Sequence, residues 1–256
     1  MKIALVQMDL AWEDPAENHR RARLRLEEAA RAGARLALLP EMFSTGFSME
    51  ADRIAEPQGG PSETFLRDAA RELGLWILAS IPQRGEPRPG NVAILASPEG
   101  DATRYAKIHP FSFGGEDRVY SGGDRVVTVT LEGVRVTPFV CYDLRFPEPF
   151  RFAADDTDLF ALVANWPEAR RAHWSTLLRA RAIENLCYVA GVNRVGEGGR
   201  LRYDGGSAVV SPWGDVLAEG GAKEEILYAD VDPAAVRDAR AKFPALLDRR
   251  PEAYRR

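Results

Sequence analysis

One pattern, repeated in the two halves of the chain, limits the folds that this sequence can adopt. Each half contains a short continuous apolar run, then a helical pattern, then a second apolar run. These segments are 34–39, 61–73 and 75–81 in the first half, and 158–164, 172–185 and 187–192 in the second. Continuous apolar runs predict strands buried on both faces, and successive strand–helix–strand units predict right-handed crossovers. The repeat therefore predicts an α/β fold in which two mixed sheets pack face to face with helices outside, a four-layer αββα sandwich.

The segments outside this repeat complete the predicted sheets and helices. An alternating strand is expected over 3–9, and Asp14 followed by proline predicts the start of a first helix. Further strands are expected over 91–96, 207–211 and 226–231. In the helix over 172–185, Trp174 and Ile183 recur at helical spacing, so both are expected on its apolar face.

Nothing in the sequence divides the chain into parts. No linker or low-complexity segment interrupts it, so we expect a single domain over residues 1–256. The segment 242–256 is charged and interrupted by prolines. It is either a solvated terminus or an arm that packs on a partner subunit, and the sequence leaves both interpretations open.

The composition argues against several classes of function. The net charge is −4 over 256 residues, whereas a nucleic-acid-binding protein needs a basic face for the phosphates. No apolar run reaches the roughly 18 residues of a membrane span, and no signal-peptide pattern precedes the first strand. The two cysteines lie far apart and form no disulfide framework. We therefore expect a cytoplasmic protein that binds neither nucleic acid nor membrane.

The segment 136–148, VTPFVCYDLRFPE, is typical of a nucleophile at the end of a strand. An apolar run ends at Cys141, and the turn-prone Tyr142-Asp143 follows at once. This arrangement lifts the sulfur onto the carboxyl edge of the sheet, where the Tyr142 N–H can point at a reacting oxyanion. The alternative is structural: free cysteine is among the most buried residue types, and Cys141 could merely cap a buried strand.

Two more polar residues follow strand-like runs and could complete a reaction centre with Cys141. Glu41 follows the run 34–39, and Lys107 lies in RYAKIHPF. In α/β sheets, ligands gather beyond the carboxyl ends of strands. There a carboxylate can accept the thiol proton and pass it to a leaving amine, while a lysine can hold the oxyanion and keep the pKa of the cysteine low. Lysine occurs at only four positions in the chain, so its presence in this motif adds weight to that role.

Three ordered motifs, ALLPEMF, YAKIHPF and VCYDLRFPE, make essentially the whole chain resemble the nitrilase superfamily of carbon-nitrogen hydrolases. The resemblance places the family's Glu-Lys-Cys triad on Glu41, Lys107 and Cys141. It places the family's second glutamate on Glu116, counted back from the Gly-Asp step of SGGD. It also implies the αββα sandwich, a homodimer formed through helices, and no cofactor.

The segments KIHPFSFGGE, ANWPEARRAHW and RARAIENLCYVAGVNRVG look most similar to the bacterial omega-amidase branch. This resemblance implies hydrolysis of the terminal amide of a short ω-monoamide of a dicarboxylic or 2-oxo acid, such as 2-oxoglutaramate or 2-oxosuccinamate. It also implies that Glu41 takes the Cys141 proton during attack, while Lys107 and the Tyr142 N–H hold the oxyanion. Ammonia then leaves, and water activated by Glu41 or Glu116 hydrolyses the thioester.

Five residues near the ends of the motifs are candidates for substrate contacts, namely Tyr142, Asn165, Trp166, Phe43 and Arg145. Phe43 and Trp166, with Phe47 and Phe113, could wall a pocket or be ordinary core, whereas Tyr142 is named for its backbone N–H. Asn165 carries amide groups that suit a small polar substrate. Arg145 could bind a substrate carboxylate bidentately, or it could pair with Asp143 or Glu148 in a structural role, which is slightly favoured.

Other functions remain open on the sequence alone. A Cys-His enzyme would need His109 or His173 as its base, and each is interpreted first as a structural histidine. Cys187 lies in an apolar run and is expected in the core. The dispersed histidines and cysteines give no zinc spacing, so no metal site is predicted. The alternative within the superfamily is an N-carbamoyl or β-ureido acid amidohydrolase or a nitrilase. The alternative outside catalysis is a scaffold that retained the fold, against which the complete triad argues.

Overall fold

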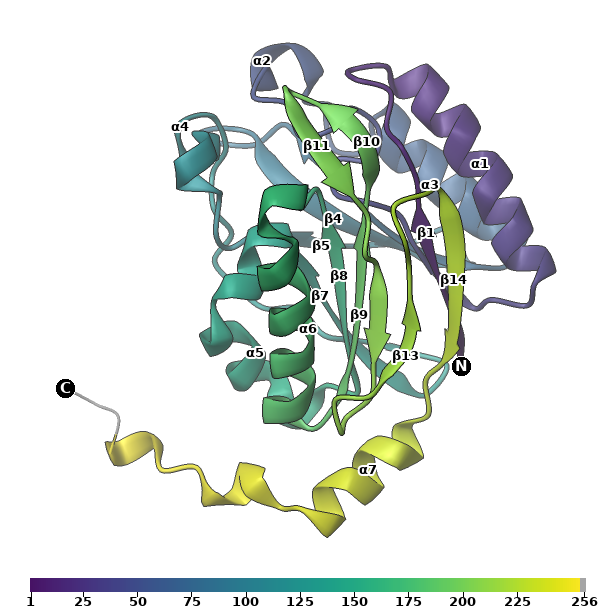
Figure 1. Ribbon diagram of the computed structural model, residues 1–256. Coiled ribbons are helices and arrows are strands. Elements are labelled where there is room, and N and C mark those ends of the chain that lie inside the picture. The colour runs from purple at the N-terminus through teal and green to yellow at the C-terminus, as the bar shows by residue number, and fades with distance from the viewer. Residues whose placement is uncertain (254–256) are drawn as a thin grey trace.

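The computed structural model describes residues 1–253 and has the four-layer order expected from the repeat (Figure 1). Within these residues, two six-stranded sheets pack face to face and helices lie outside them. The first sheet has the order β14-β1-β2-β3-β4-β5, with bounds Glu225–Asp230, Lys2–Gln7, Leu36–Leu38, Trp76–Gln83, Gly90–Ala96 and Ala102–Ala106. The second has the order β13-β12-β9-β8-β7-β6, with bounds Val216–Glu219, Ala208–Val210, Tyr188–Asn193, Leu159–Ala164, Val134–Val140 and Val129–Leu131.

The pairing of the central strands confirms the two βαβ halves. Strands β1, β2 and β3 are parallel to one another, as are β7, β8 and β9. The crossovers between them carry α1 Pro15–Arg31, α3 Pro61–Leu73, α5 Pro147–Ala153 and α6 Arg171–Asn185. Because parallel strands share a direction, their carboxyl ends meet at one edge of each sheet. Glu41, Cys141 and Asn165 follow β2, β7 and β8 at these edges.

Strand β1 shows why the predicted strands read as continuous apolar runs. Leu5 belongs to the buried cluster between the sheets, together with Phe139 of β7. Its neighbour Val6 belongs instead to the cluster on the outer face, together with Leu26 of α1. Successive side chains of a strand point to opposite faces, and here both faces are covered by another layer. Such a strand therefore needs apolar residues at every position.

The first helix begins where its sequence predicts. The Asp14 carboxylate accepts the backbone N–H of Glu17 at 3.1 Å, and Pro15 occupies the first helical turn. The buried residues of α1 recur every three or four positions, at Asn18, Ala22, Leu26 and Ala29. This spacing gives the helix the single apolar face with which it covers the sheet.

Some elements differ from the sequence-based expectation. The Ile183 side chain is 52% exposed, although its spacing predicts an inward position. The buried face of α6 carries Trp174, Leu178 and Ala182, and residue 183 lies on another side of the helix. The apolar pattern also misses short elements that bury few residues, among them α2 Ala51–Ile54, α4 Glu116–Val119, β10 Val195–Gly198 and β11 Leu201–Asp204.

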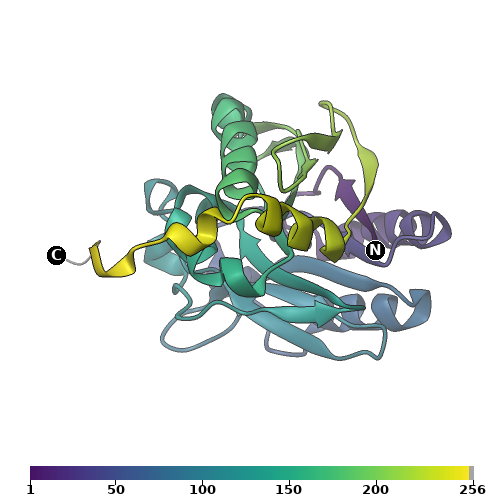
Figure 2. The same ribbon diagram turned by 90° about the horizontal axis from the view of Figure 1, so that it is seen from below.

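The end of the chain forms an arm along the bottom of the molecule (Figure 2). It starts with α7 Pro233–Lys242 and continues through two short 3₁₀ helices. Leu246 packs with Ala154 and Leu186, so the arm is anchored to the body. Residues 254–256 of this segment lie outside the described residues. Within residues 1–253, no helix combines the length and the apolar character needed to cross a membrane.

Candidate active site

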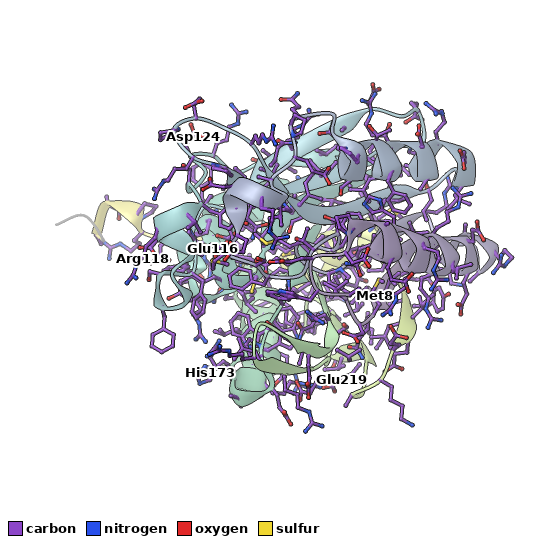
Figure 3. The ribbon with its side chains drawn as sticks, turned by 90° about the horizontal axis from the view of Figure 1, so that it is seen from above. Met8, Glu116, Arg118, Asp124, His173 and Glu219 are labelled. Atoms are coloured by element: carbon purple, nitrogen blue, oxygen red, sulfur yellow. The ribbon has the colours of Figure 1, made fainter. Side chains whose placement is uncertain are left out.

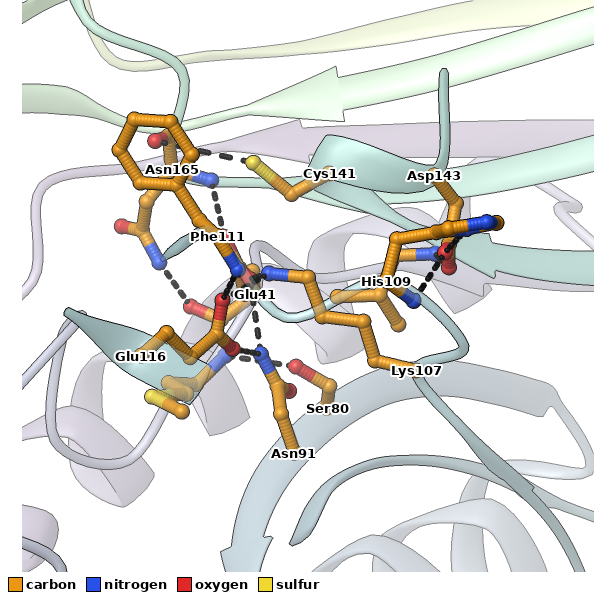
Figure 4. A network of polar contacts seen from close by, with 12 residues as sticks. Glu41, Ser80, Asn91, Lys107, His109, Phe111, Glu116, Cys141, Asp143 and Asn165 are labelled. Carbon is orange, nitrogen blue, oxygen red and sulfur yellow. Dashed lines mark hydrogen bonds and ion pairs between the residues drawn. The ribbon is translucent and has the colours of Figure 1, made fainter. Parts of the chain in front are cut away.

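The three residues of the predicted triad come together at the carboxyl edge of the two sheets, in the network of Figure 4. Glu41 lies in the loop after β2, Lys107 directly follows β5, and Cys141 directly follows β7. Glu116, the fourth predicted residue, starts the short helix α4 and joins them. Figure 3 looks onto this end of the molecule and shows Glu116 inside the fold, whereas Arg118 on the same helix points outward.

Lys107 lies between two carboxylates that are buried from solvent. Its Nζ donates to Glu41 Oε1 and to Glu116 Oε2, each at 2.8 Å. The Lys107 side chain is 1% exposed and both glutamates are 0% exposed. The Asn91 amide donates to the same carboxylates, at 2.8 Å to Glu41 and 3.1 Å to Glu116. Asn91 therefore belongs to the network, although the sequence reasoning placed it only at the start of a strand.

These contacts set the charges of the buried groups. Burial alone would lower the pKa of Lys107, but the charges of Glu116 and Glu41 outweigh it and raise the pKa above the ordinary value. Burial raises the pKa of Glu116, and the charge of Glu41 adds to this effect while Lys107 opposes it. Lys107 therefore remains positively charged in the site, next to an excess of carboxylate.

Cys141 occupies a sharp turn between β7 and a 3₁₀ helix, Cys141–Arg145. Its φ is +45°, in the left-handed region that costs an L-residue about 1–2 kcal/mol. The Asp143 carboxylate braces the turn, because it accepts the Val140 N–H at 3.1 Å. Tyr142 lies in the first turn of the 3₁₀ helix, where backbone N–H groups have no partner within the helix. Such a turn can present a nucleophile beside a backbone N–H that binds an oxyanion.

The pKa of Cys141 corrects one expectation. Lys107 does lower the pKa of this thiol, but burial and the negative charge of Glu41 raise it more, to well above its ordinary value. The resting site therefore holds a protonated thiol rather than a preformed thiolate. The Cys141 Sγ donates to the Asn165 carbonyl at 3.9 Å, and the nearby Glu41 side chain contributes to the same upward shift of the pKa. The Glu41 carboxylate is therefore a nearby group that can accept the thiol proton.

Asn165 fixes the position of Glu41. The Asn165 backbone N–H donates to Glu41 Oε2 at 2.9 Å, and its side-chain amide donates to the Glu41 carbonyl at 2.6 Å. The two oxygens of the Glu41 carboxylate therefore have different partners, Lys107 on one and Asn165 on the other. The side-chain oxygen of Asn165 is buried and has no partner among the described residues. This oxygen is therefore a buried acceptor that no donor among the described residues satisfies.

The histidines of the rival Cys-His interpretation are occupied elsewhere. His109 Nδ1 is 2.8 Å from Asp143 Oδ1, and its ring stacks on Phe146. His173 Nδ1 is 3.2 Å from a nitrogen of Arg145. Neither ring contacts the sulfur of Cys141 through a hydrogen bond, so the arrangement of a Cys-His pair is not present in the described residues. His109 instead helps Asp143 to hold the nucleophile's turn.

A cavity opens over Cys141, and most predicted substrate contacts line it. Its wall contains Tyr142, Asn165, Trp166 and Arg145. Phe43 does not line the cavity as predicted. It is fully buried in the outer cluster of the first sheet, where its ring stacks with Phe65 and makes a tilted contact with His19. Phe113 is also absent from the wall, with its side chain 87% exposed, whereas Phe47 does line the cavity.

Arg145 does not have the structural role that the sequence slightly favoured, which was to pair with Asp143 or Glu148. Among the described residues, it forms no ion pair with Asp143, Glu148 or another acid. Its guanidinium lies over the Trp166 ring at 4.8 Å and over the Tyr142 ring at 5.9 Å, facing the cavity. The charge is therefore available to a ligand.

Further lining residues escaped the sequence reasoning, namely Phe111, Arg170, Leu201 and Tyr203. Leu201 and Tyr203 come from the hairpin β10–β11, whose strands bury few residues and so leave no strong apolar pattern. Arg170 lies in ANWPEARRAHW beside other charged residues, and nothing in that order distinguishes it from Arg171.

Comparison with known proteins gives one consistent result. Residues 2–241 match the family model named carbon-nitrogen hydrolase. The omega-amidase YafV of Escherichia coli K12 is 39% identical over 250 residues, which cover 97% of this chain and 96% of that protein. The 2-oxoglutaramate amidase of Bacillus subtilis is 33% identical, with 98% of each chain covered. The solved structure of XC1258 from Xanthomonas campestris, a CN-hydrolase superfamily protein, has a TM-score of 0.93 and 43% identity over 98% of this chain and 97% of that one.

Proposed function

The chain belongs to the carbon-nitrogen hydrolase family, and we propose that it hydrolyses the terminal amide of 2-oxoglutaramate and similar short ω-monoamides of 2-oxo acids. The observation that carries this proposal is the buried Glu41–Lys107–Cys141 centre, with the cationic Arg145 on the wall of the same cavity. The proposal is supported by two relatives, named an omega-amidase and a 2-oxoglutaramate amidase, that match nearly the whole chain.

Acylation begins with a proton transfer that the geometry prepares. The Cys141 sulfur attacks the amide carbon as its proton passes to Glu41, because the thiol is protonated at rest. The carbonyl oxygen becomes an oxyanion, which the Lys107 ammonium and the Tyr142 N–H stabilise. Glu41 then protonates the leaving nitrogen, the C–N bond breaks, and ammonia departs. The product of this half-reaction is a thioester between the substrate acyl group and Cys141.

Deacylation uses the same groups in the reverse order. Glu41 removes a proton from a water molecule, and the resulting hydroxide attacks the thioester carbon. The same donors hold the second oxyanion, the C–S bond breaks, and the sulfur recovers its proton from Glu41. Glu116 keeps Lys107 charged throughout, and it also accepts the backbone N–H of Phe111. Glu116 thereby connects the charged centre to the aromatic wall of the cavity.

The positive charge of Arg145 favours amide substrates that also carry a carboxylate. Its guanidinium lines the cavity without an acidic partner among the described residues. A planar guanidinium binds a carboxylate through two parallel hydrogen bonds. With the amide carbon at Cys141, a carboxylate at Arg145 makes the substrate a short ω-monoamide. A neutral amide or a simple nitrile lacks this contact.

The functional unit that we propose is a cytoplasmic homodimer of single-domain chains. Three large apolar side chains, Phe152, Ile183 and Phe243, are 80%, 52% and 56% exposed and line one groove formed by α5, α6 and the arm. A second copy of the chain that covers this groove would remove the apolar surface from water. Both cysteines are free, which suits a reducing compartment. Sedimentation of wild type and Phe152→Glu tests the assembly: the wild type should be a dimer and the variant a monomer.

Ammonia release tests the proposed function. Wild type and Cys141→Ala are assayed in parallel with 2-oxoglutaramate, 2-oxosuccinamate, L-glutamine, butyronitrile and an N-carbamoyl amino acid. We expect turnover that depends on Cys141 and is highest on the 2-oxo amides. Turnover confined to the nitrile or the carbamoyl compound would retain the catalytic centre and refute the substrate.

A further inference from the structure

We propose that Arg170, which the mechanism above does not use, is a second cationic anchor of the substrate pocket. Together with Arg145, it selects amides that carry a carboxylate and a 2-oxo group over amides that carry a 2-ammonium group. The inference deepens the proposed function and rests on it, because it concerns how the same pocket recognises the far end of the same substrate.

The two guanidinium groups lie on one aromatic wall of the cavity. The guanidinium carbon of Arg170 is 5.3 Å from the ring centre of Phe111. The Phe111 ring is 4.9 Å from that of Tyr142, edge to face, and the Arg145 guanidinium carbon is 5.9 Å from the Tyr142 ring. All four side chains line the cavity that contains the Cys141 sulfur. Arg170 and Arg145 therefore approach the same ligand volume from two sides of a continuous wall.

The main chain holds Arg170 in this place. Its carbonyl accepts the Trp166 indole N–H at 2.8 Å, and its N–H donates to the Pro167 carbonyl at 2.9 Å. Both contacts involve only backbone atoms of Arg170, so a change of its side chain leaves them in place. The guanidinium itself makes no ion pair among the described residues. The backbone hydrogen bonds therefore explain the position of residue 170. No contact among the described residues explains why its side chain is positively charged.

The pairing of the neighbouring arginines makes the unpaired charge of Arg170 more notable. Arg171 lies 3.2 Å from Asp204, and Arg202 lies 3.4 Å from Glu168. None of the described residues that line the cavity is acidic. Two cations on one wall of a partly enclosed pocket repel each other, and an anion between them removes that repulsion. The pocket is therefore built for a ligand that brings negative charge.

The same charges explain a choice between two closely related amides. 2-Oxoglutaramate and L-glutamine share a carboxylate and a terminal amide and differ only at the second carbon. A 2-oxo oxygen accepts a hydrogen bond from a guanidinium, whereas a 2-ammonium group has only donors and a positive charge. Beside Arg145 and Arg170, the ammonium group meets repulsion without a compensating acid, which is how a site rejects a near-isostere.

Arg170→Gln is the variant that tests this role. The KM for 2-oxoglutaramate should rise about 10- to 100-fold, as expected for the loss of a charge-assisted hydrogen bond, with a smaller change in kcat. The preference for 2-oxoglutaramate over L-glutamine should fall by a similar factor. Butyramide, which has neither a carboxylate nor a 2-oxo group, should be affected least. Arg170→Lys should recover part of the KM, because it keeps the charge but not the planar fork.

Arg200→Gln is the matched control. Arg200 is exposed in the turn of the hairpin β10–β11. It lines a second cavity, which shares Leu201 and Tyr203 with the cavity over Cys141, but it does not line the cavity over Cys141 itself. The Arg200→Gln variant should have the wild-type kcat and KM. A rise in KM equal to that in Arg170→Gln would show that any nearby positive charge attracts the substrate, and it would overturn the inference. A wild-type KM and preference in Arg170→Gln would also overturn it, while the proposed function stood. A wild type that hydrolyses no 2-oxo amide would refute both.

Discussion

Replacing Lys107 with methionine removes the positive charge between two buried carboxylates and changes the length of the side chain little. The Nζ of Lys107 lies 2.8 Å from both Glu41 and Glu116, and all three side chains are 1% exposed or less. Two catalytic effects follow. The oxyanion loses a donor, which costs about 3–4 kcal/mol or 10²–10³ in kcat. The two carboxylates lose their shared cation, so one of them retains a proton and Glu41 becomes a poorer base.

These effects act on one centre and do not add simply, so we expect a fall in kcat of at least about 10³. The assay is ammonia release from 2-oxoglutaramate at saturating substrate, with Lys223→Met, a change at an exposed lysine, as the matched control. The control should retain wild-type kcat. A kcat within about tenfold of wild type in Lys107→Met would refute the assignment of the oxyanion site.

The same variant separates stability from catalysis. Removing one partner of a buried ion pair costs about 3–5 kcal/mol, because the remaining charge is uncompensated. Adding Glu116→Gln to Lys107→Met removes one of the two carboxylates and should restore much of the free energy of unfolding in urea. It should not restore turnover. Recovery of both together would mean that Lys107 acts only through the stability of the fold.

Three further outcomes follow from the structure. Burial raises the pKa of Cys187 from 9.0 to about 12; the folded chain keeps a proton that the unfolded chain loses, so stability falls as pH rises above 9. Between pH 8 and 10, wild type should lose about 1.4 kcal/mol more unfolding free energy than Cys187→Ala, and equal losses would contradict the burial effect. Asp14→Ala should lower the unfolding free energy by about 1 kcal/mol through the lost helix cap, without changing kcat. Iodoacetamide should modify Cys141 faster than Cys187, because Cys187 has no exposed surface. Peptide mass mapping at matched times measures both rates, and equal labelling would contradict this expectation.

The strands, the crossover helices and the three triad motifs could be predicted because each is a short continuous segment with its own residue pattern. A buried strand such as β8 needs apolar residues on both faces, and the polar residue after it marks the carboxyl edge. Glu41 and Cys141 follow such runs, so their places alone predicted that they meet at this edge. Lys107 instead follows β5, which is only partly buried and contains Thr103 and Arg104, so its motif was the signal that placed it. The comparisons confirm the family to which the motifs pointed.

The lining of the pocket could not be predicted in the same way, because side-chain direction decides it. Phe43 and Phe47 lie in the same loop, yet Phe43 packs into the outer core and Phe47 lines the cavity. The hairpin that brings Tyr203 over the site has exposed strands and no apolar repeat. The raised pKa of Cys141 also depends on three-dimensional burial, which outweighs the charge of a nearby lysine.

In the proposed reaction, Cys141 carries the acyl group of the substrate as a thioester. The direct measurement is acid quenching of wild type during turnover of 2-oxoglutaramate, followed by intact mass and peptide mapping. We expect a 2-oxoglutaryl adduct on the peptide that contains Cys141, formed and lost at rates that match kcat. In Cys141→Ala we expect neither the adduct nor ammonia release. An adduct on another residue, or substantial turnover by Cys141→Ala, would contradict the proposed reaction.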